Sequence, residues 1–164
     1  MEEAGLIYRI FNVSKPGLPL SAYQDLSAFK VYACDCGLLR RLAKLSPEII
    51  LSGNTVYTEF KGALAENAIL QSLVPQNDVM PYYWSSENRA EVDFLLQFPT
   101  EVVPVEVKAD SRISGKSLSV YANKFVPALK IRFSMNNLKI NDGLLSCPIP
   151  LAGWISKIVF TRVL

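Results

Sequence analysis

Four residues in the central part of the chain have the side chains that phosphodiester chemistry needs: Glu66, Asp93, Glu106 and Lys108. Carboxylate oxygens hold Mg²⁺ while several of its waters stay bound. The cation lowers the pKa of a bound water, and a nearby lysine can orient that water and stabilise the transition state. We therefore expect Glu66, Asp93 and Glu106 to hold Mg²⁺ or Mn²⁺ and Lys108 to serve the attacking nucleophile.

The composition removes several other chemistries. The 164 residues include no histidine, which excludes the commonest general base and the commonest zinc ligand. Cys34, Cys36 and Cys147 are too few for a disulfide framework, and we expect buried thiols rather than a zinc site. The net charge is only +2, so any contact with nucleic acid must use a local basic patch.

Alternation along two strands is expected to bring three of the four residues together. A strand over 101–109 would place Glu106 and Lys108 on one face and its valines on the other. In the strand before it, over 91–98, Asp93 would face away from a row of apolar residues, namely Val92, Phe94 and Leu96. If the two strands pair, the tips of Asp93, Glu106 and Lys108 should form one cluster.

A helix is expected to bring the fourth residue to that cluster. The pattern predicts a helix over 58–73, with Thr58 as its N-cap. Glu66 interrupts the small and apolar stripe of this helix, and a buried carboxylate is costly unless it is paired or bound to a cation. Gly62 would let the helix approach a sheet closely. We therefore expect Glu66 to face Asp93 and Glu106.

The remaining patterns predict an α/β fold with a mixed central sheet flanked by helices and a small β-rich N-terminal piece. Short connections predict an antiparallel meander of three strands over 80–109. The other expected elements are a hairpin from 5–13 and 28–33, a basic helix over 37–45, a helix over 118–126, strands over 130–135 and 144–148, and an apolar helix or strand over 154–164.

The loop at 46–55 suggests a boundary near residue 50, which separates a piece of residues 1–50 from a domain of residues 51–164. We expect residues 1–45 to make few contacts with the rest. An exposed apolar patch at Leu6, Ile7, Tyr8 and Ile10 would mark a missing partner.

The ordered series resembles the PD-(D/E)xK signature of restriction-endonuclease-like nucleases. Asp93 is followed by a spacer of twelve residues and then Glu106-Val107-Lys108, and Glu66 matches the acid that many such enzymes carry in the preceding helix. Val92 stands where the signature has proline. The chain also resembles the C-terminal region of a large prokaryotic family of AAA-type P-loop ATPases, through residues 2–7, 29–32, 35–39, 62–67, 82–84, 91–94 and 106–108.

The resemblance implies a winged-helix-like remnant over 1–50 and a restriction-endonuclease-like domain over 51–164. It implies a C-terminal fragment that lacks the ATP-binding domain, so the missing ATPase domain is an expected partner. Ser114-Gly115-Lys116-Ser117 is similar to the end of a Walker A loop, but Asp110 falls where the first glycine belongs, so we expect no ATP site in this chain.

These observations lead to a Mg²⁺-dependent nuclease or nuclease-like domain that acts on DNA. The alternative is a non-catalytic module of the parent ATPase that binds nucleic acid or protein. The intact acidic cluster favours the enzyme, and the weak basic character favours the module. A third possibility is a domain that forms an oligomer through Trp154 and the apolar segment after it; the sequence does not give the oligomeric state.

Two groups of side chains have both a functional and an ordinary interpretation. Tyr82, Tyr83 and Trp84 could stack on bases, but core positions are expected for two of them. Arg40, Arg41 and Lys44 could touch phosphate, but a solvated helix face is the expected role. The N-terminus is not a basic signal sequence and no apolar run is long enough to cross a bilayer, so we expect a cytoplasmic chain with no membrane partner.

Overall fold

The computed structural model describes residues 1–46, 48, 56–76, 80–86, 90–109 and 115–160. Within these residues the strands are β1 (Ile7–Val13), β2 (Gln24–Ala33), β3 (Tyr82–Ser86), β4 (Ala90–Gln97), β5 (Val102–Val107), β6 (Lys130–Ser134), β7 (Lys139–Asn141) and β8 (Leu144–Pro148). The helices are α1 (Cys36–Leu42), α3 (Val56–Leu73), α4 (Lys116–Phe125) and α5 (Ile155–Phe160), with short 3-10 helices η1 (Leu20–Tyr23), η2 (Val74–Gln76) and η3 (Ile149–Trp154).

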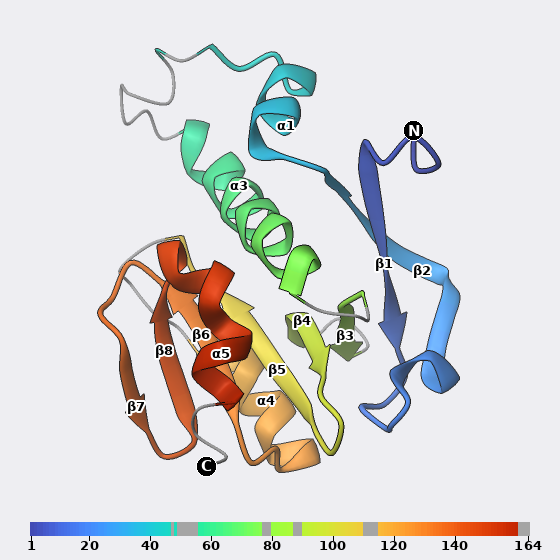
Figure 1. The fold of residues 1–164 in the computed structure, drawn as a ribbon, viewed down its shortest axis with the longest axis vertical. Coiled ribbons are helices and arrows are strands. Elements are labelled where there is room, and N and C mark those ends of the chain that lie inside the picture. Colours follow the sequence, from blue (N-terminus) through green and yellow to red (C-terminus); the bar gives the residue numbers. More distant parts are fainter. Residues whose placement is uncertain (47, 49–55, 77–79, 87–89, 110–114, 161–164) are drawn as a thin grey trace.

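The strands form one mixed sheet in the order β2-β1-β3-β4-β5-β6-β8-β7 (Figure 1). Strands β3, β4 and β5 form the expected antiparallel meander. Strands β5, β6 and β8 are parallel neighbours, and α4 crosses over between β5 and β6, as a parallel pair requires. The predicted α/β class, with a mixed central sheet flanked by helices, is therefore confirmed.

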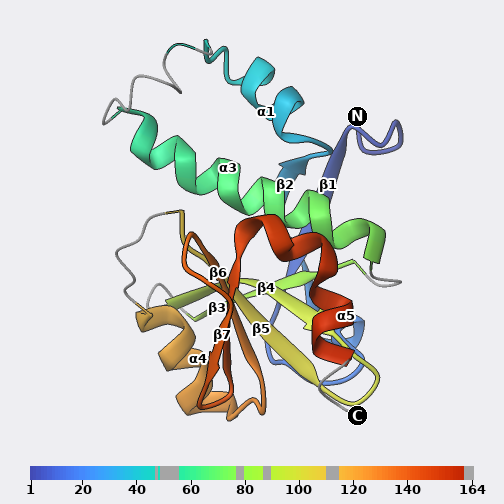
Figure 2. The ribbon, with the colours of Figure 1, turned by 60° about the vertical axis from the view of Figure 1, so that its left-hand side comes forward.

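Two apolar cores cover the two faces of this sheet. The larger core joins α3 and α5 to β4, β5 and β6, and the smaller core joins α4 to β3 and β4. Figure 2 shows α4 on one side of the strands and α5 on the other, with α3 crossing above the sheet. The faces are called the α3 face and the α4 face below.

The N-terminal piece is part of the main sheet. Strands β1 and β2 form the expected hairpin, and β1 continues the sheet because it pairs with β3 in parallel. Ile10 is fully buried in the larger core, whereas Leu6 is exposed and Ile7 and Tyr8 are partly buried. The expectation that residues 1–45 form a separate unit is wrong, because the hairpin supplies core residues. The boundary near residue 50 lies outside the described residues, and the winged-helix-like character stays a prediction.

Two local expectations about helices change, and the structure decides a third in favour of a helix. Helix α3 begins at Val56, so Thr58 lies inside the helix and is not its N-cap. A Cβ at Gly62 would meet no described atom within 4 Å, so this glycine is not needed for a close approach to the sheet. The C-terminal apolar segment forms η3 and α5, while residues 161–164 lie outside the described part of the chain.

A short hairpin, β7–β8, was not predicted. Asp142 and Gly143 connect its strands with positive φ angles of 46° and 70°. Aspartate followed by glycine is a strong signal for the two-residue turn in which both central residues have positive φ. The sequence therefore carried the signal for this hairpin.

We predict that Ile10→Ala destabilises the whole domain by about 2–5 kcal/mol, because it leaves a cavity in the core that the hairpin shares with α3 and β5. Urea unfolding should show one cooperative transition, shifted to lower urea. Leu26→Ala is the matched control in β2: Leu26 is 66% exposed, so its loss should cost less than about 0.5 kcal/mol. A separate early transition, or equal effects of the two variants, would contradict the single core.

Candidate functional site

Strand β4 contains one extra residue where it passes β3. Tyr82 pairs with Leu95, and Trp84 pairs with Val92. Between these pairs β3 has a single residue, whereas β4 has two, Asp93–Phe94. This arrangement is a β-bulge, in which the usual alternation of side chains between the two faces is interrupted.

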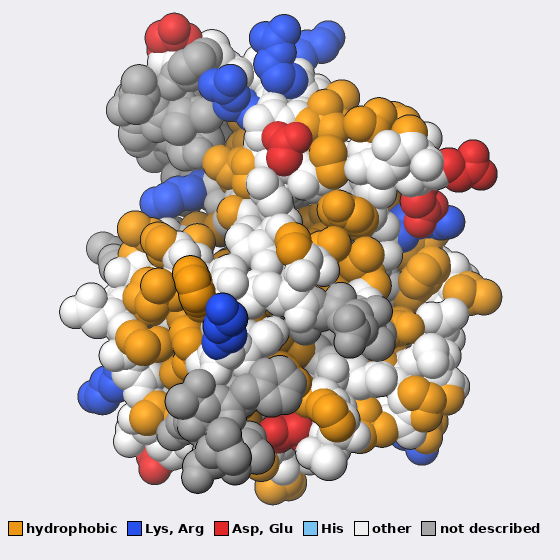
Figure 3. Space-filling model, viewed as in Figure 1, with side chains coloured by type: hydrophobic (Ala, Val, Ile, Leu, Met, Phe, Trp, Pro, Cys, Tyr) orange, Lys and Arg blue, Asp and Glu red, His pale blue; other side chains and the backbone are white. Residues whose placement is uncertain are grey.

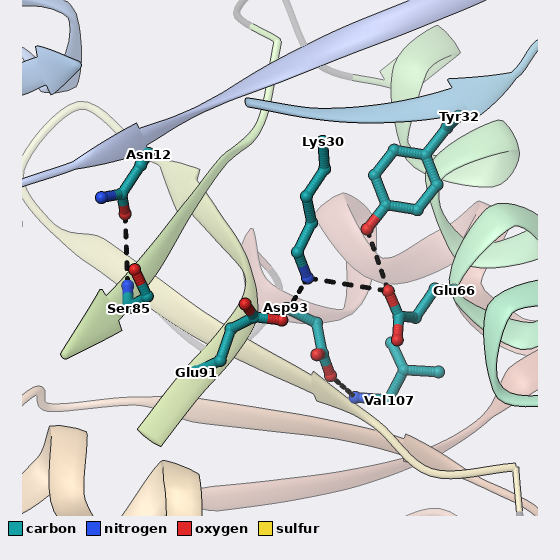
Figure 4. Close-up of polar contacts among 8 residues, drawn as sticks. All are labelled: Asn12, Lys30, Tyr32, Glu66, Ser85, Glu91, Asp93 and Val107. Carbon is teal, nitrogen blue, oxygen red and sulfur yellow. Dashed lines mark hydrogen bonds and ion pairs between the residues drawn. The ribbon is translucent and has the colours of Figure 1, made fainter. Parts of the chain in front are cut away.

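The bulge changes the face to which Asp93 points. Val92 packs in the smaller core on the α4 face, while Phe94 packs in the larger core on the α3 face. The expectation that Val92 and Phe94 share one face is therefore wrong. Asp93 points with Phe94 toward α3 and the N-terminal hairpin (Figure 4).

The Asp93 carboxylate accepts a main-chain hydrogen bond from β5 at a point where the main-chain pairing of β4 with β5 has ended. The pairing of β4 with β5 ends at Phe94 and Val105. Beyond this point the Val107 N–H donates to Asp93 Oδ2 at 2.7 Å. The carboxylate is therefore fixed at the end of the paired region, beside the strand that carries Glu106 and is followed by Lys108.

Glu66 approaches Asp93 from α3, and the surroundings of these two carboxylates are called the carboxylate pocket below. Its Oε2 atom accepts a hydrogen bond of 2.9 Å from the Tyr32 hydroxyl and lies 3.9 Å from Lys30 Nζ. Lys30 also forms an ion pair with Glu91. Figure 4 shows the Lys30 ammonium between Glu91 and Glu66, close to Asp93. The hairpin thus brings a cation and a hydroxyl donor to two carboxylates.

Asn67 holds Glu66 in this position. Asn67 is 1% exposed, and its side-chain amide bonds to both the N–H and the C=O of Ala33, at 2.9 and 3.1 Å. These two bonds fix α3 against the end of β2. Because Glu66 precedes Asn67 and Tyr32 precedes Ala33, the same contact sets Glu66 beside Tyr32.

The pocket changes the acidity of its groups. Burial, and then repulsion by Glu66, raises the pKa of Asp93 to about 7. Burial lowers the pKa of Lys30, but its hydrogen bond to Glu91 and the charge of Glu66 outweigh this and raise the pKa overall. Burial and Glu66 also raise the pKa of Tyr32. Lys30 is therefore a cation and Tyr32 a hydrogen-bond donor at neutral pH.

Glu106 lies on the other face of the sheet. Strand β5 alternates regularly, so Val105 and Val107 pack in the larger core while Glu106 points to the α4 face. The Glu106 side chain is 2% exposed and accepts a hydrogen bond of 2.8 Å from Arg132 Nε. Its other oxygen lies 3.4 Å from Lys108 Nζ.

The expectation that Glu66, Asp93, Glu106 and Lys108 form one cluster is therefore wrong as stated. The structure brings together Glu66 and Asp93 on the α3 face, and Glu106 and Lys108 by their ion pair. The two pairs are linked by Lys108, whose charge lowers the pKa of Asp93 and so opposes the larger effects of burial and Glu66. The β-bulge is the physical reason for this separation. It turns Asp93 to the α3 face, whereas the regular alternation of β5 keeps Glu106 on the α4 face.

A sequence profile of the domain of unknown function DUF4143 matches residues 61–152. The chain belongs to the DUF4143 family. Glu66, Asp93, Glu106 and Lys108 of this DUF4143 chain all lie inside the matched region, whereas Lys30 and Tyr32 lie outside it. None of the curated proteins and none of the solved structures compared with the chain matches it. No helix of the described residues has the length and apolar character to cross a membrane.

A divalent cation fits two of the three expected ligands. Among the described residues, no group of three or more histidine, cysteine or acidic side chains is arranged to hold a metal ion. Glu106 is committed to Arg132, so the predicted three-carboxylate site is wrong in its geometry. Glu66 and Asp93 still offer carboxylate oxygens in one pocket, and Mg²⁺ commonly takes one or two carboxylates together with waters and substrate phosphates.

The other candidate groups have ordinary positions. Tyr83 and Trp84 are 8% and 1% exposed, so neither offers a free face for base stacking. Arg40 and Arg41 lie in the last turn of α1. On the side of the molecule in Figure 3, Lys and Arg side chains gather above the sheet near α1 and are scattered elsewhere. Cys147 is buried as expected, while Cys34 and Cys36 are partly exposed; all three are free thiols.

Sequence reasoning missed Lys30, Tyr32, Asn67 and Arg132. A weak signal existed for the first two, because Lys30 and Tyr32 alternate along an apolar strand and must share a face. Asn67 adjoins Glu66 in the helix, but nothing in the sequence indicates that it binds Ala33. The contact of Arg132 with Glu106 follows from the register of β5 and β6, which the sequence does not specify.

We predict that Asp93→Asn stabilises the metal-free chain at pH 8 by on the order of 2 kcal/mol. A carboxyl whose pKa rises on folding holds its proton more tightly in the folded state, so it costs stability above the unfolded pKa. The parent chain should therefore lose stability as the pH rises from 4 to about 7, the pKa of folded Asp93. Asparagine still accepts the Val107 hydrogen bond but carries no charge.

The measurement is urea unfolding at pH 5 and pH 8 in the presence of a chelator. The difference between Asp93→Asn and the parent chain should be clearly larger at pH 8. Glu3→Gln, at an exposed position, is the control and should show no such difference. Equal stability changes at the two pH values would contradict the raised pKa.

Proposed function

We propose that this DUF4143 chain is a Mg²⁺-dependent nuclease or nuclease-like domain that acts on DNA. The observation that carries the proposal is the position of Asp93, which lies between Glu66 and the Glu106–Lys108 pair and has a raised pKa. Two carboxylates that repel each other favour a divalent cation, and such perturbed acids are typical of functional sites. Mn²⁺ is expected to replace Mg²⁺.

In this proposal each residue has a distinct task. Glu66 and Asp93 hold the cation, which supplies an acidic bound water and neutralises charge on a phosphate. Lys108 orients the nucleophile, and Glu106 holds Lys108 in position through the contact of 3.4 Å. Glu106 is therefore a positioning residue, which revises the role that we expected from the sequence. Tyr32 keeps the Glu66 carboxylate oriented through its hydroxyl.

The order of the acidic residues and the lysine along the chain also supports the cleavage of phosphodiester bonds. The resemblance to PD-(D/E)xK nucleases rests on Asp93, Glu106 and Lys108 in their spacing, with Glu66 in the preceding helix. The resemblance to the C-terminal region of AAA-type ATPases supports an ATPase domain as partner, with which the chain would act on DNA. A cytoplasmic location fits both DNA as substrate and three free thiols.

A second candidate is a non-catalytic module that binds nucleic acid or protein for such an ATPase. Lys30 already provides a positive charge beside Glu66 and Glu91, and Arg132 neutralises Glu106. A pocket whose charges are balanced by its own side chains can be stable without a metal ion. In this case the acidic residues would maintain the fold and perform no reaction.

We predict that Mn²⁺ binding separates the roles of the acidic residues. Asp93→Asn and Glu66→Gln should each weaken Mn²⁺ binding by roughly 10–100-fold, whereas Glu106→Gln should change it by less than about threefold. Lys108→Ala should keep Mn²⁺ binding and remove cleavage of a DNA duplex, because lysine serves the water and not the cation. Calorimetric titration gives the affinities, and a gel assay gives cleavage.

Two outcomes would count against parts of this account. Loss of Mn²⁺ binding in Glu106→Gln equal to that in Asp93→Asn would restore the three-carboxylate site. The absence of any Mn²⁺ or Mg²⁺ binding at millimolar concentration, with the melting temperature unchanged, would reject the nuclease. The non-catalytic module would then be the better description.

A further inference from the structure

Basic residues are concentrated in one segment of the chain. Between Asp110 and Asp142 the sequence contains no aspartate or glutamate but six lysines and arginines: Arg112, Lys116, Lys124, Lys130, Arg132 and Lys139. Since the net charge of the chain is only +2, the remainder is net negative. The described part of this segment forms α4, β6 and β7, so the local basic patch that nucleic-acid binding requires lies at the α4 face.

A pocket of about 180 Å³ opens in this patch, between α4 and the strands β6 and β8. Its polar lining consists of Lys130, Arg132, Ser119 and Asn123, over an apolar floor that includes Leu118 and Leu144. None of the described residues that line it is acidic. The two cations and the Asn123 amide are donors to an oxyanion, whereas the Ser119 hydroxyl donates to the Gly115 carbonyl at 2.8 Å.

Arg132 connects this pocket to two other charged features. Its Nε atom bonds to Glu106 at 2.8 Å, which fixes the plane of the guanidinium. On the other side the guanidinium lies against Gly115, where an added Cβ would come within 2.2 Å of Nη2. A larger residue at position 115 would displace this guanidinium, so glycine allows Arg132 to approach the start of α4.

The start of α4 is itself positive. Gly115 provides no side-chain cap, and the first turn of α4 contains no acidic residue. The unpaired N–H groups of a helix N-terminus carry a partial positive charge and favour anions. Glu106 already pairs with the Arg132 guanidinium, so an anion in the adjoining pocket would compensate the Lys130 ammonium and the helix terminus.

We propose that the pocket between α4, β6 and β8 binds a phosphate group, with Lys130 and Arg132 as its cationic contacts and Asn123 as its neutral donor. It lies on the face of the sheet opposite Glu66 and Asp93, so it is distinct from the carboxylate pocket. The phosphate can come from free inorganic phosphate or from a nucleic-acid strand. Only the choice of a strand rests on the proposed function.

The test is a titration of the full chain with inorganic phosphate and, separately, with a short DNA duplex in the presence of a chelator. Amide chemical shifts in nitrogen-15 NMR report binding at Ser119 and Asn123. Lys130→Gln should weaken binding by about tenfold, since a hydrogen bond to a charged group is worth about 1.5 kcal/mol or more. Asn123→Asp, at an exposed position, should weaken it at least as much because it places a negative charge in the lining.

Lys15→Gln is the matched control, because it removes the same charge from an exposed position that does not line the pocket. It should change binding by less than about twofold. If Lys130→Gln and Asn123→Asp both lose the binding of phosphate and of the duplex, the pocket binds a phosphate group from either source. Loss of duplex binding alone, with no phosphate binding in the parent chain, supports the strand as the source.

The proposal is overturned if neither probe shifts Ser119 and Asn123, or if Lys15→Gln weakens binding as much as Lys130→Gln does. Failure of the proposed nuclease gives a different pattern, since the chain would then bind phosphate normally but neither bind Mn²⁺ nor cleave DNA. If Lys130→Gln does not fold, as judged by its melting curve, Asn123→Asp decides the question.

Discussion

The arrangement of charges in this protein depends on the β-bulge at Asp93–Phe94. A regular strand would place Asp93 opposite Glu106 on the α4 face, as alternation along the two strands predicts. The extra residue in β4 instead turns Asp93 toward α3, where it meets Glu66. The same bulge lets Val92 pack against α4 and Phe94 against α3, so the strand contributes to both cores.

The two groups of buried charges are stabilised separately. On the α3 face, Lys30 and Tyr32 from the hairpin compensate Glu66, and Asn67 keeps the helix in register with β2. On the α4 face, Arg132 and Lys108 compensate Glu106. A buried charge without a partner costs several kcal/mol, so each group needs its own counter-charge. The hairpin is consequently required for the candidate site as well as for the core.

The sequence predicted the parts of the structure that depend on local pattern. The meander, the flanking helices and the regular alternation that separates Glu106 from Val105 and Val107 follow from periodicity and short connections. The position of Asp93 could not be predicted, because the run from Glu91 to Phe94 alternates polar and apolar residues without any residue that marks a bulge. The partners Lys30 and Arg132 depend on which strands become neighbours, and this is decided by the packing of the whole chain.

The central claim is that Asp93 shares its pocket with Glu66 and not with Glu106. The most direct test is the pKa of Asp93, measured by carbon-13 NMR of its carboxyl group in the metal-free parent chain, in Glu66→Gln and in Glu106→Gln. The account predicts a pKa of about 7 in the parent chain. It predicts that Glu66→Gln lowers this pKa by about one pH unit or more, while Glu106→Gln leaves it within about half a unit. A fall in Glu106→Gln with no change in Glu66→Gln would contradict the account.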